Sequence, residues 1–328
     1  MKIFTIRTAA VLAAVVLLFS GCAGEQKSVT IGISKIVEHP ALNAVEQGIK
    51  DEMAELGYDD ISFDVQNAAG DMNTAGQIAS KFLFDDVDIA VGIATPTSIA
   101  LATAITDRPV IFTAVTDPVD AGLVDNLESG KNNVTGVSDL TPVAEQIDLI
   151  IELTGAQSIG TVYTSGEPNA VKLAELAEEA AANRGLEFVS TTIADSGQVK
   201  QAAEAIMDRV DAVYVSTDNT VFSALPALIE VANQNNVPVI TADPSSFGDY
   251  DVLAAYGFDY YAMGRATGRL IDEVLEGSEP ADIPTRFLTD PEDLLLVLNL
   301  DVADRLGIEV SDELVEQAGS IIRNGEVE

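Results

Sequence analysis

The chain has 328 residues, of which 53 are Asp or Glu and 17 are Lys or Arg, and its formal net charge at pH 7 is −36. A chain this negative repels phosphate groups, which excludes DNA and RNA as partners. With 47% hydrophobic residues and a length greater than one core usually serves, we expect two lobes. The acidity suits a salty habitat, where counter-ions screen it, or reflects the composition of the lineage, and the sequence leaves both readings open.

The N-terminus has the layout of a secretory signal peptide. Lys2 and Arg7 precede an apolar run over residues 8–19, which ends in Ser20-Gly21-Cys22. The run is too short to span a bilayer comfortably, because a membrane helix needs about 20 apolar residues. We expect residues 1–21 to be removed, which takes away two basic side chains and moves the net charge from −36 to −38.

Cys22 is the only cysteine, so it has no partner for an internal disulfide. The stretch from Phe19 to Cys22 resembles a lipoprotein processing box, with Phe19 where Leu is usual, and the resemblance implies a lipid on Cys22. The alternative is a conventional signal peptide cut nearby and an incidental free thiol. With the lipid, residues 22–28 form a short tether that holds the folded part at the outer face of the cytoplasmic membrane.

Strand-like apolar runs alternate with helix-like amphipathic stretches from residue 29 onward, the pattern of a parallel sheet with helices on its faces. The first series of expected strands comprises Val29–Ser34, Ile61–Val65, Ile89–Ala94 and Val110–Val115. The second series comprises Ser158–Tyr163, Glu187–Ile193, Ala212–Val215, Val237–Thr241 and Leu253–Tyr256. Two series in matching order predict an α/β fold with two similar, doubly wound parallel-sheet lobes joined by a hinge.

Helices between the strands are expected to be structural. In the first, Leu42, Val45 and Ile49 recur at helical spacing after Pro40, and residues 170–184 behave in the same way before Gly185. We place the crossings between lobes near residues 139, 253 and 280. Lobe 1 is therefore expected over residues 29–139 and about 254–279, and lobe 2 over residues 140–253 and about 280–328.

Polar residues just after the expected strands are candidates for a ligand site, because ligands of open α/β sheets bind beyond the carboxyl ends of the strands. The first series contributes Glu38, His39, Thr95, Thr97, Ser98, Thr116 and Asp117. The second contributes Ser165, Asn169, Thr217, Asp218, Asn219 and Asp243. Tyr163 and Tyr256, near strand ends, could stack on a flat ligand or simply be half-buried packing residues.

Two of these groups suggest how a charged ligand would be held. Pro96 opens a helix between Thr95 and Thr97, and the free N–H groups of such a helix end attract a carboxylate. Asp117 and Asp218 each follow an apolar strand, where either could pair with an ammonium group or act as an ordinary cap. His39, the only histidine, could line the cleft or cap the next helix.

The sequence offers few of the residues that an enzyme active site needs. One histidine and one cysteine leave no His-rich metal site and no spare thiol nucleophile, and no phosphate-binding or dinucleotide-binding glycine loop occurs. We therefore predict no catalytic residue, no metal and no cofactor.

Five stretches carry a resemblance that covers nearly the whole chain after residue 28. They are Val37 to Leu42, Ile93 to Thr97, Phe112 to Pro118, Tyr214 to Thr220 and Gly257 to Tyr261. In this order they resemble the ABC-transporter substrate-binding lipoproteins often described as tryptophan- or tyrosine-binding, which have a periplasmic-binding-protein type I fold.

The resemblance implies an exported receptor that closes by hinge motion on a small ligand, most simply an aromatic or related amino acid. Its expected partners are an ABC permease with its ATPase and, through the lipid, the membrane; a monomer is expected. An anchored sensor that presents its closed form to a chemoreceptor or kinase would look the same in sequence. An extracellular α/β enzyme is the remaining alternative.

Overall fold

The computed structural model describes residues 29–248, 250–288 and 291–328. The expected signal peptide, Cys22 and the tether lie outside these residues and remain predictions. Within the described part of the chain, no helix is long and apolar enough to cross a membrane.

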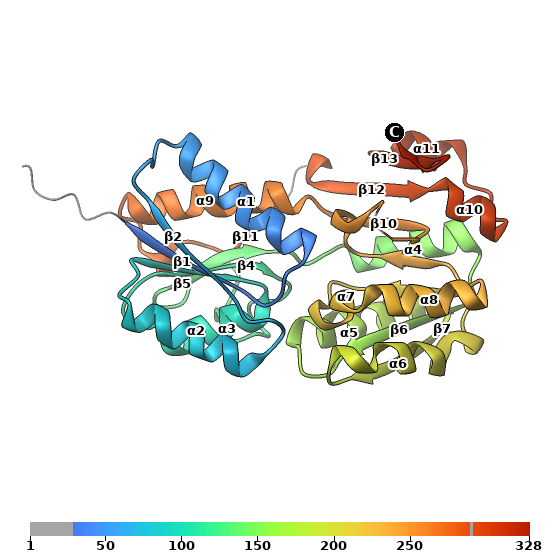
Figure 1. The fold of residues 1–328 in the computed structure, drawn as a ribbon, viewed down its shortest axis with the longest axis horizontal. Coiled ribbons are helices and arrows are strands. Elements are labelled where there is room, and N and C mark those ends of the chain that lie inside the picture. Colours follow the sequence, from blue (N-terminus) through green and yellow to red (C-terminus); the bar gives the residue numbers. More distant parts are fainter. Residues whose placement is uncertain (1–28, 249, 289–290) are drawn as a thin grey trace, which may run out of the picture.

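The chain folds into two α/β lobes that lie side by side (Figure 1). The sheet of lobe 1 has the order β11-β5-β4-β3-β1-β2, and all its strands are parallel. Its strands are β1 (Thr30–Lys35), β2 (Ser62–Asn67), β3 (Ile89–Ile93), β4 (Val110–Val115), β5 (Val134–Ser138) and β11 (Arg286–Phe287). Its helices are α1 (Pro40–Glu55), α2 (Met72–Phe84), α3 (Thr95–Ala104) and α9 (Tyr260–Leu275).

The sheet of lobe 2 has the order β14-β13-β12-β10-β9-β8-β6-β7. Its strands are β6 (Ser158–Thr164), β7 (Glu187–Ile193), β8 (Ala212–Val215), β9 (Val239–Thr241), β10 (Ala254–Phe258), β12 (Leu294–Asn299), β13 (Ser320–Arg323) and β14 (Glu326–Val327). Its helices are α4 (Val143–Thr154), α5 (Pro168–Asn183), α6 (Val199–Ile206), α7 (Asn219–Ser223), α8 (Leu225–Asn235), α10 (Leu300–Leu306) and α11 (Asp312–Gln317).

Both lobes repeat one strand order, since β2-β1-β3-β4-β5 in lobe 1 corresponds to β7-β6-β8-β9-β10 in lobe 2. This confirms the expected fold of two doubly wound lobes. The parallel pattern ends beyond β10, because β12 runs antiparallel to β10 and β13 antiparallel to β14. Two expectations therefore needed correction: residues 134–138 form a strand as well as leading to the first crossing, and lobe 2 carries an antiparallel extension.

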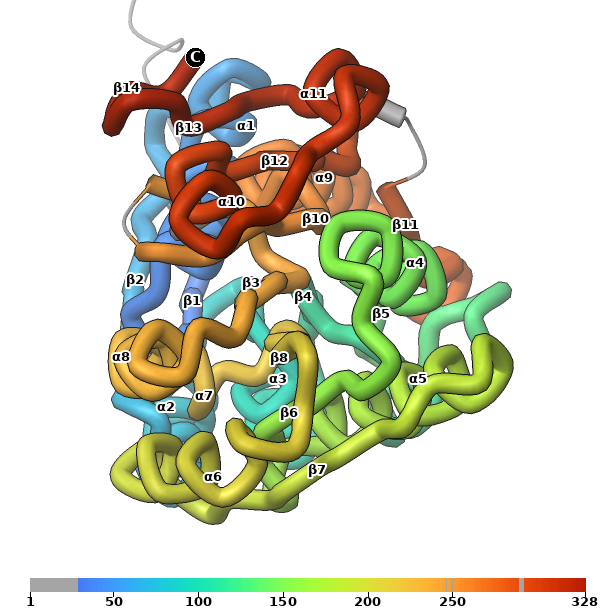
Figure 2. Tube along the Cα trace, turned by 90° about the vertical axis from the view of Figure 1, so that its right-hand side faces the viewer, coloured from blue at the N-terminus to red at the C-terminus, as the bar shows by residue number. Residues whose placement is uncertain are grey.

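Helices cover both faces of each sheet. In lobe 1, α1 and α9 lie on one face and α2 and α3 on the other (Figure 1). In lobe 2, α4 and α5 lie on one face and α6 and α8 on the other (Figure 2). Lobe 2 therefore has two separate apolar cores, one under each pair of helices, as a sheet buried on both faces requires.

The two later crossings lie further along the chain than the sequence suggested. β10 pairs with β9 and β12, so residues 254–258 belong to lobe 2, and the chain returns to lobe 1 at Asp259. β11 pairs with β5, so the chain remains in lobe 1 through Phe287 before β12. The physical reason is that strand pairing, which composition does not display, assigns these short segments to a sheet.

The contact between α1 and α9 joins distant parts of the chain. A Cβ atom at Gly48 would collide with the carbonyl oxygen of Tyr261, and one at Gly264 would collide with that of Val45. Only glycine allows the two backbones to approach this closely. At one edge of the contact, buried Glu52 pairs with Arg265 at 2.7 Å and with Arg269 at 3.3 Å.

Candidate functional site

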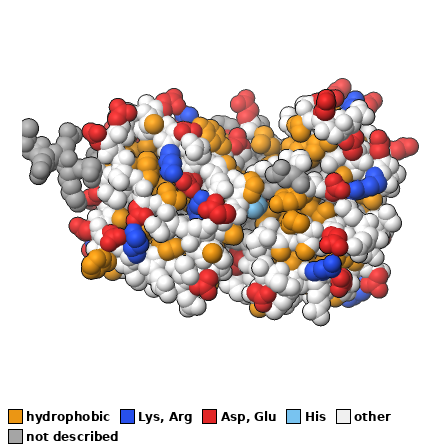
Figure 3. All heavy atoms as spheres, in the orientation of Figure 1, with side chains coloured by type: hydrophobic (Ala, Val, Ile, Leu, Met, Phe, Trp, Pro, Cys, Tyr) orange, Lys and Arg blue, Asp and Glu red, His pale blue; other side chains and the backbone are white. Residues whose placement is uncertain are grey.

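A small cavity, with a volume of about 30 Å³, lies where the carboxyl ends of the two sheets face each other. On the molecular surface the single histidine shows at the boundary between the lobes, and acidic side chains are spread over both (Figure 3). The cavity is lined by His39, Ala41, Leu42, Ala94, Ala114, Thr116, Asp139, Asn169, Thr217, Asp218, Asn219, Phe222, Asp243 and Tyr260. Three of these residues are Asp and none is Lys or Arg, so the lining is acidic.

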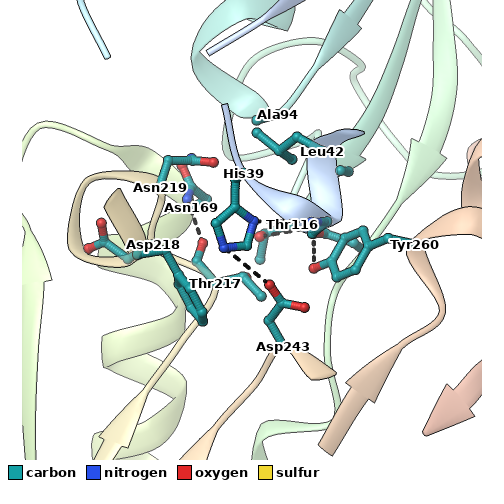
Figure 4. Close-up of a pocket in the computed structure, with 14 residues that line it drawn as sticks. His39, Leu42, Ala94, Thr116, Asn169, Thr217, Asp218, Asn219, Asp243 and Tyr260 are labelled. Atoms are coloured by element: carbon teal, nitrogen blue, oxygen red, sulfur yellow. Dashed lines mark hydrogen bonds and ion pairs between the residues drawn. The ribbon is translucent and has the colours of Figure 1, made fainter. Parts of the chain in front are cut away.

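His39 contacts both lobes. It caps α1, and its Nδ1 atom accepts a hydrogen bond from the N–H of Ala41 at 3.3 Å. Its Nε2 atom points across the cavity to Asp243 Oδ2 at 3.5 Å (Figure 4), and its ring meets the ring of Phe222 edge-on with centroids 4.9 Å apart. Burial lowers the pKa of His39, an effect that Asp243 partly opposes. A neutral imidazole with its proton on Nε2 fits these contacts.

Asp139 is a buried carboxylate at the first crossing between lobes. Tyr260 donates to one of its oxygens at 3.1 Å and Thr116 to the other at 3.3 Å. Burial, with a smaller effect from the negative charge of Asp243, raises the pKa of Asp139 to about 6. A cation placed in the cavity would oppose that shift by favouring the ionised form.

Asp243 follows β9 in lobe 2 and is 3% exposed. Its carboxylate accepts one hydrogen bond, from the N–H of Ser245 at 2.8 Å, and faces His39. An ionised carboxylate has about four acceptor positions, so most of its capacity is not used by backbone donors.

Asp218 lines the cavity, but its carboxylate is engaged within lobe 2. It accepts from the N–H and hydroxyl of Thr164 at 2.6 and 2.8 Å and from the N–H of Val221 at 2.9 Å. Burial, together with the nearby charge of Glu167, raises the pKa of Asp218 to about 7. These contacts favour a structural cap over the ammonium partner that the sequence suggested.

Glu167 ties the polar residues of lobe 2 together. Its carboxylate accepts from the side-chain amides of Asn219 at 2.6 Å and Asn169 at 3.3 Å, and from the hydroxyl of Thr220 at 2.6 Å. Asn169 also donates to the carbonyl of Thr217 at 3.1 Å. Asn169 Oδ1 and Thr217 Oγ1 are buried without a hydrogen-bond partner in the described structure, so both are available to a ligand.

The helix end at α3 reaches the cavity through its cap, Ala94, rather than through its hydroxyl groups. Thr97 Oγ1 donates to the carbonyl of Ile93 at 2.7 Å, and Ser98 Oγ donates to that of Ala94 at 2.8 Å. Both side chains are fully buried and face their own turn. Thr95 Oγ1 is buried without a partner but does not line the cavity.

Of the fifteen residues that the sequence suggested for the site, His39, Thr116, Asn169, Thr217, Asp218, Asn219 and Asp243 line the cavity. The other eight do not line it: they are the α3 residues Thr95, Thr97 and Ser98, and Glu38, Asp117, Tyr163, Ser165 and Tyr256. Three of these residues have partners elsewhere. Glu38 forms an ion pair with Lys35, Asp117 forms one with Lys172, and the hydroxyl of Ser165 donates to the carbonyl of Ile193. Tyr256 borders a separate groove on lobe 2 with Leu149 and Leu314.

The remaining lining residues lie outside those fifteen. They are Ala41, Leu42, Ala94, Ala114, Asp139, Phe222 and Tyr260. A usable signal existed for Asp139, which follows a strand as Asp218 and Asp243 do, and for Tyr260, which opens a helix. The apolar members gave none, because alanine, leucine and phenylalanine in such positions predict a core. The described residues contain no cluster of His, Cys, Asp and Glu suited to a metal ion.

The sequence and fold match known proteins over most of their length. Residues 30–322 match the family model for ABC transporter substrate binding proteins. The tyrosine-binding protein of Clostridioides difficile is 38% identical over 288 residues, covering 87% of this chain and 82% of that protein. A periplasmic binding protein/LacI transcriptional regulator from Alkaliphilus metalliredigens, 14% identical with a TM-score of 0.59 over 82% of this chain and 97% of that one, shares the fold alone.

Two solved relatives differ in how closely they superpose on this chain. A Streptococcus pneumonia ABC domain in complex with L-Trp is 32% identical, covers 90% of this chain and 100% of its own, and superposes with a TM-score of 0.86. The ligand-free, open structure of a substrate-binding protein from Clostridium difficile is 34% identical over 90% of this chain and 99% of its own, yet its TM-score is 0.68. The whole chain therefore superposes more closely on the complex with L-Trp than on the ligand-free, open structure, although the identities are similar.

The matched residues include nearly all the strands and helices of both lobes, and the cavity lies at their junction. Proteins of this kind bind a solute outside the cytoplasm for an importer and catalyse no reaction. The chain belongs to the family of ABC transporter substrate-binding proteins.

Proposed function

We propose that this protein is an exported, lipid-anchored receptor that binds an aromatic or related L-amino acid between its two lobes and delivers it to an ABC permease. The observation that carries the proposal is the pair Asp139 and Asp243, buried carboxylates that reach an acidic cavity where neither is paired with a Lys or Arg of the described residues. A ligand ammonium group would supply the missing positive charge and form charge-assisted hydrogen bonds.

The rest of an amino acid has complementary partners in the cavity. Ala94 is the cap of α3 and has no side chain that could accept from the first N–H groups of that helix, so a ligand carboxylate is favoured there. Leu42, Phe222 and the ring of His39 provide an apolar surface for a flat side chain. The tyrosine named for one relative and the L-Trp bound to another agree with this chemistry.

A thermal-shift titration of residues 23–328 tests the proposal. L-Trp, L-Tyr and L-Phe should raise the melting temperature in proportion to the logarithm of their concentration, whereas a sugar or nucleoside should not. Indole-3-propionate, which keeps the ring and carboxylate of L-Trp but lacks the amino group, is the matched control and should give little shift. Equal shifts with L-Trp and indole-3-propionate would contradict the role of the carboxylate pair.

The lipid anchor has its own test. Expressed at full length, the protein should remain with the membrane after lysis and incorporate labelled fatty acid, whereas the Cys22→Ala variant should do neither. Release of both forms into the medium would contradict the anchor and leave ligand binding unaffected.

A further inference from the structure

Two alanines on the floor of the cavity have backbone conformations that L-residues rarely adopt. Ala94 has φ +81° and ψ 158°, and Ala114 has φ +53°. Seven non-glycine residues of the described structure have positive φ, and four of them are Asn or Asp, which tolerate it. The other three are Ala69, Ala94 and Ala114, and the last two line the cavity.

The two strained residues are neighbours on adjacent strands. Ile93 of β3 pairs with Thr113 of β4, so Ala94 and Ala114 each directly follow a member of this pair. Ala114 lies where the pairing of β4 with β5 shifts register, as in a β-bulge. The floor of the cavity is therefore built from two irregular strand ends.

Hydrogen bonds on both sides hold Ala94 in its conformation. Its N–H donates to the carbonyl of Thr113 at 3.0 Å, and its own carbonyl accepts from the N–H and hydroxyl of Ser98 at 3.2 and 2.8 Å. Strain of this kind persists only where the surroundings over-determine it, and it gathers at functional sites.

Glycine would adopt both conformations without steric cost. What alanine adds at each position is one methyl group, and both residues are nearly buried against the cavity, with 3% and 6% exposure. We propose that Ala94 and Ala114 determine ligand specificity: their methyl groups, held in strained backbone, close the lobe 1 floor of the cavity and limit the size of the bound ligand. This inference rests on the proposed function.

Single glycine variants separate strain from binding. Ala94→Gly and Ala114→Gly should each raise the melting temperature of the ligand-free protein by about 2–4 °C, because they relieve strain. Ala69→Gly is the matched control, because Ala69 has φ +52° but is exposed and does not line the cavity. It should stabilise the protein without changing binding.

Binding is measured by calorimetry with L-Trp, L-Tyr and L-Phe and with a ring-methylated analogue of each. For the amino acid that the wild-type protein prefers, Ala94→Gly and Ala114→Gly should lose about tenfold in affinity, the usual effect of one methyl group in a pocket. The ring-methylated analogue should lose less, so selectivity shifts toward the larger ligand.

The outcomes distinguish the two proposals. If the wild-type protein binds an amino acid and the cavity variants keep its affinity and selectivity, this inference is overturned and the proposed function stands. If the wild-type protein binds none of the three, the proposed function fails and this inference with it. A lower melting temperature for both cavity variants, beside a higher one for Ala69→Gly, would overturn the assignment of strain.

Discussion

The two walls of the cavity are built differently. Lobe 1 contributes apolar groups, Leu42 from helix α1 and Ala94 and Ala114 from irregular backbone, whereas lobe 2 contributes hydrogen-bonding groups, such as Asn169 and Thr217. These lobe 1 groups limit the shape of the cavity, and these lobe 2 groups offer polar partners. Neither wall is complete without the other, so a ligand is recognised fully only when the lobes have closed.

Asp218 and Asp243 of lobe 2 also differ in what their carboxylates contact. Both follow neighbouring strands of lobe 2 and both line the cavity. Asp218 accepts three hydrogen bonds from its own lobe, whereas Asp243 accepts one and faces the histidine of the other lobe. Equivalent places in the sequence thus support a structural role for Asp218 and the proposed contact with a ligand for Asp243.

Among the variants that test this difference, Asp218→Ala should have the largest effect, which is on stability. It leaves the buried N–H groups of Thr164 and Val221 without acceptors, which we expect to lower the free energy of unfolding by about 2–4 kcal/mol in urea. Asp195→Ala, which removes an exposed cap in the same lobe, should cost no more than about 1 kcal/mol. Equal losses for the two variants would show that Asp218 is not a structural cap.

Asp243→Asn should affect binding rather than folding. Asparagine can still accept from the N–H of Ser245 but lacks the charge that would pair with an ammonium group. We expect calorimetry to show affinity for the amino acid lowered about 10- to 100-fold, the value of a charged hydrogen bond, with the free energy of unfolding within about 1 kcal/mol of wild type. An unchanged dissociation constant would remove Asp243 from the site.

As pH rises through 6, the contribution of Asp139 to stability should fall, whereas the affinity for the ligand should rise. Burial raises the pKa of Asp139 to about 6, above its ordinary 3.8, so its contribution to stability is present below about pH 4 and is lost as pH rises through 6. The ligand needs the ionised form, so affinity should fall as pH drops below 6, by up to about tenfold per unit. Asp139→Asn should flatten the pH dependence of affinity and reduce that of stability, leaving the part that comes from Asp218, whose pKa burial raises to about 7. Identical curves for variant and wild type would refute this role.

Lys172→Gln should have the smallest effect. Lys172 of lobe 2 pairs with Asp117 and Asp120 of lobe 1, at 2.9 and 2.7 Å, so these ion pairs link the two lobes. Partly exposed pairs contribute about 0.2–1 kcal/mol, which corresponds to at most about a fivefold loss of affinity, smaller at high salt. Lys200→Gln removes the same charge from a pair within lobe 2 and should leave affinity unchanged. Equal losses would assign the effect to net charge.

Hydrophobic periodicity was sufficient to predict the fold. Both series of strands and the helix after Pro40 are found close to their expected bounds, because buried parallel strands and amphipathic helices have strong local patterns. Five strands were missed. They are β5, β12 and β13, of four to six residues, and β11 and β14, whose two residues carry no such pattern and depend on their neighbours. The later crossings shifted for the same reason.

Site residues were harder to predict than strands. The rule that ligands lie beyond strand ends found His39 and Asp243, but it does not state which way a side chain points. Thr97 and Ser98 turn back to their own helix, and Tyr256 faces another groove. The apolar part of the lining could not be predicted from local patterns. Phe222 lines the cavity only because lobe 2 faces lobe 1, and Ala94 does so through an unusual φ.

The glycine contact between α1 and α9 has a consequence for the order in which the chain becomes stable. All strands of lobe 1 except β11 have been synthesised by Ser138, but Met263, Leu270 and Ile271 of α9, which complete its core, come much later. A chain that emerges N-terminus first therefore exposes one apolar face of lobe 1 while the whole first run of lobe 2 is made. That interval is when chaperones and proteases have their best access to the newly made protein.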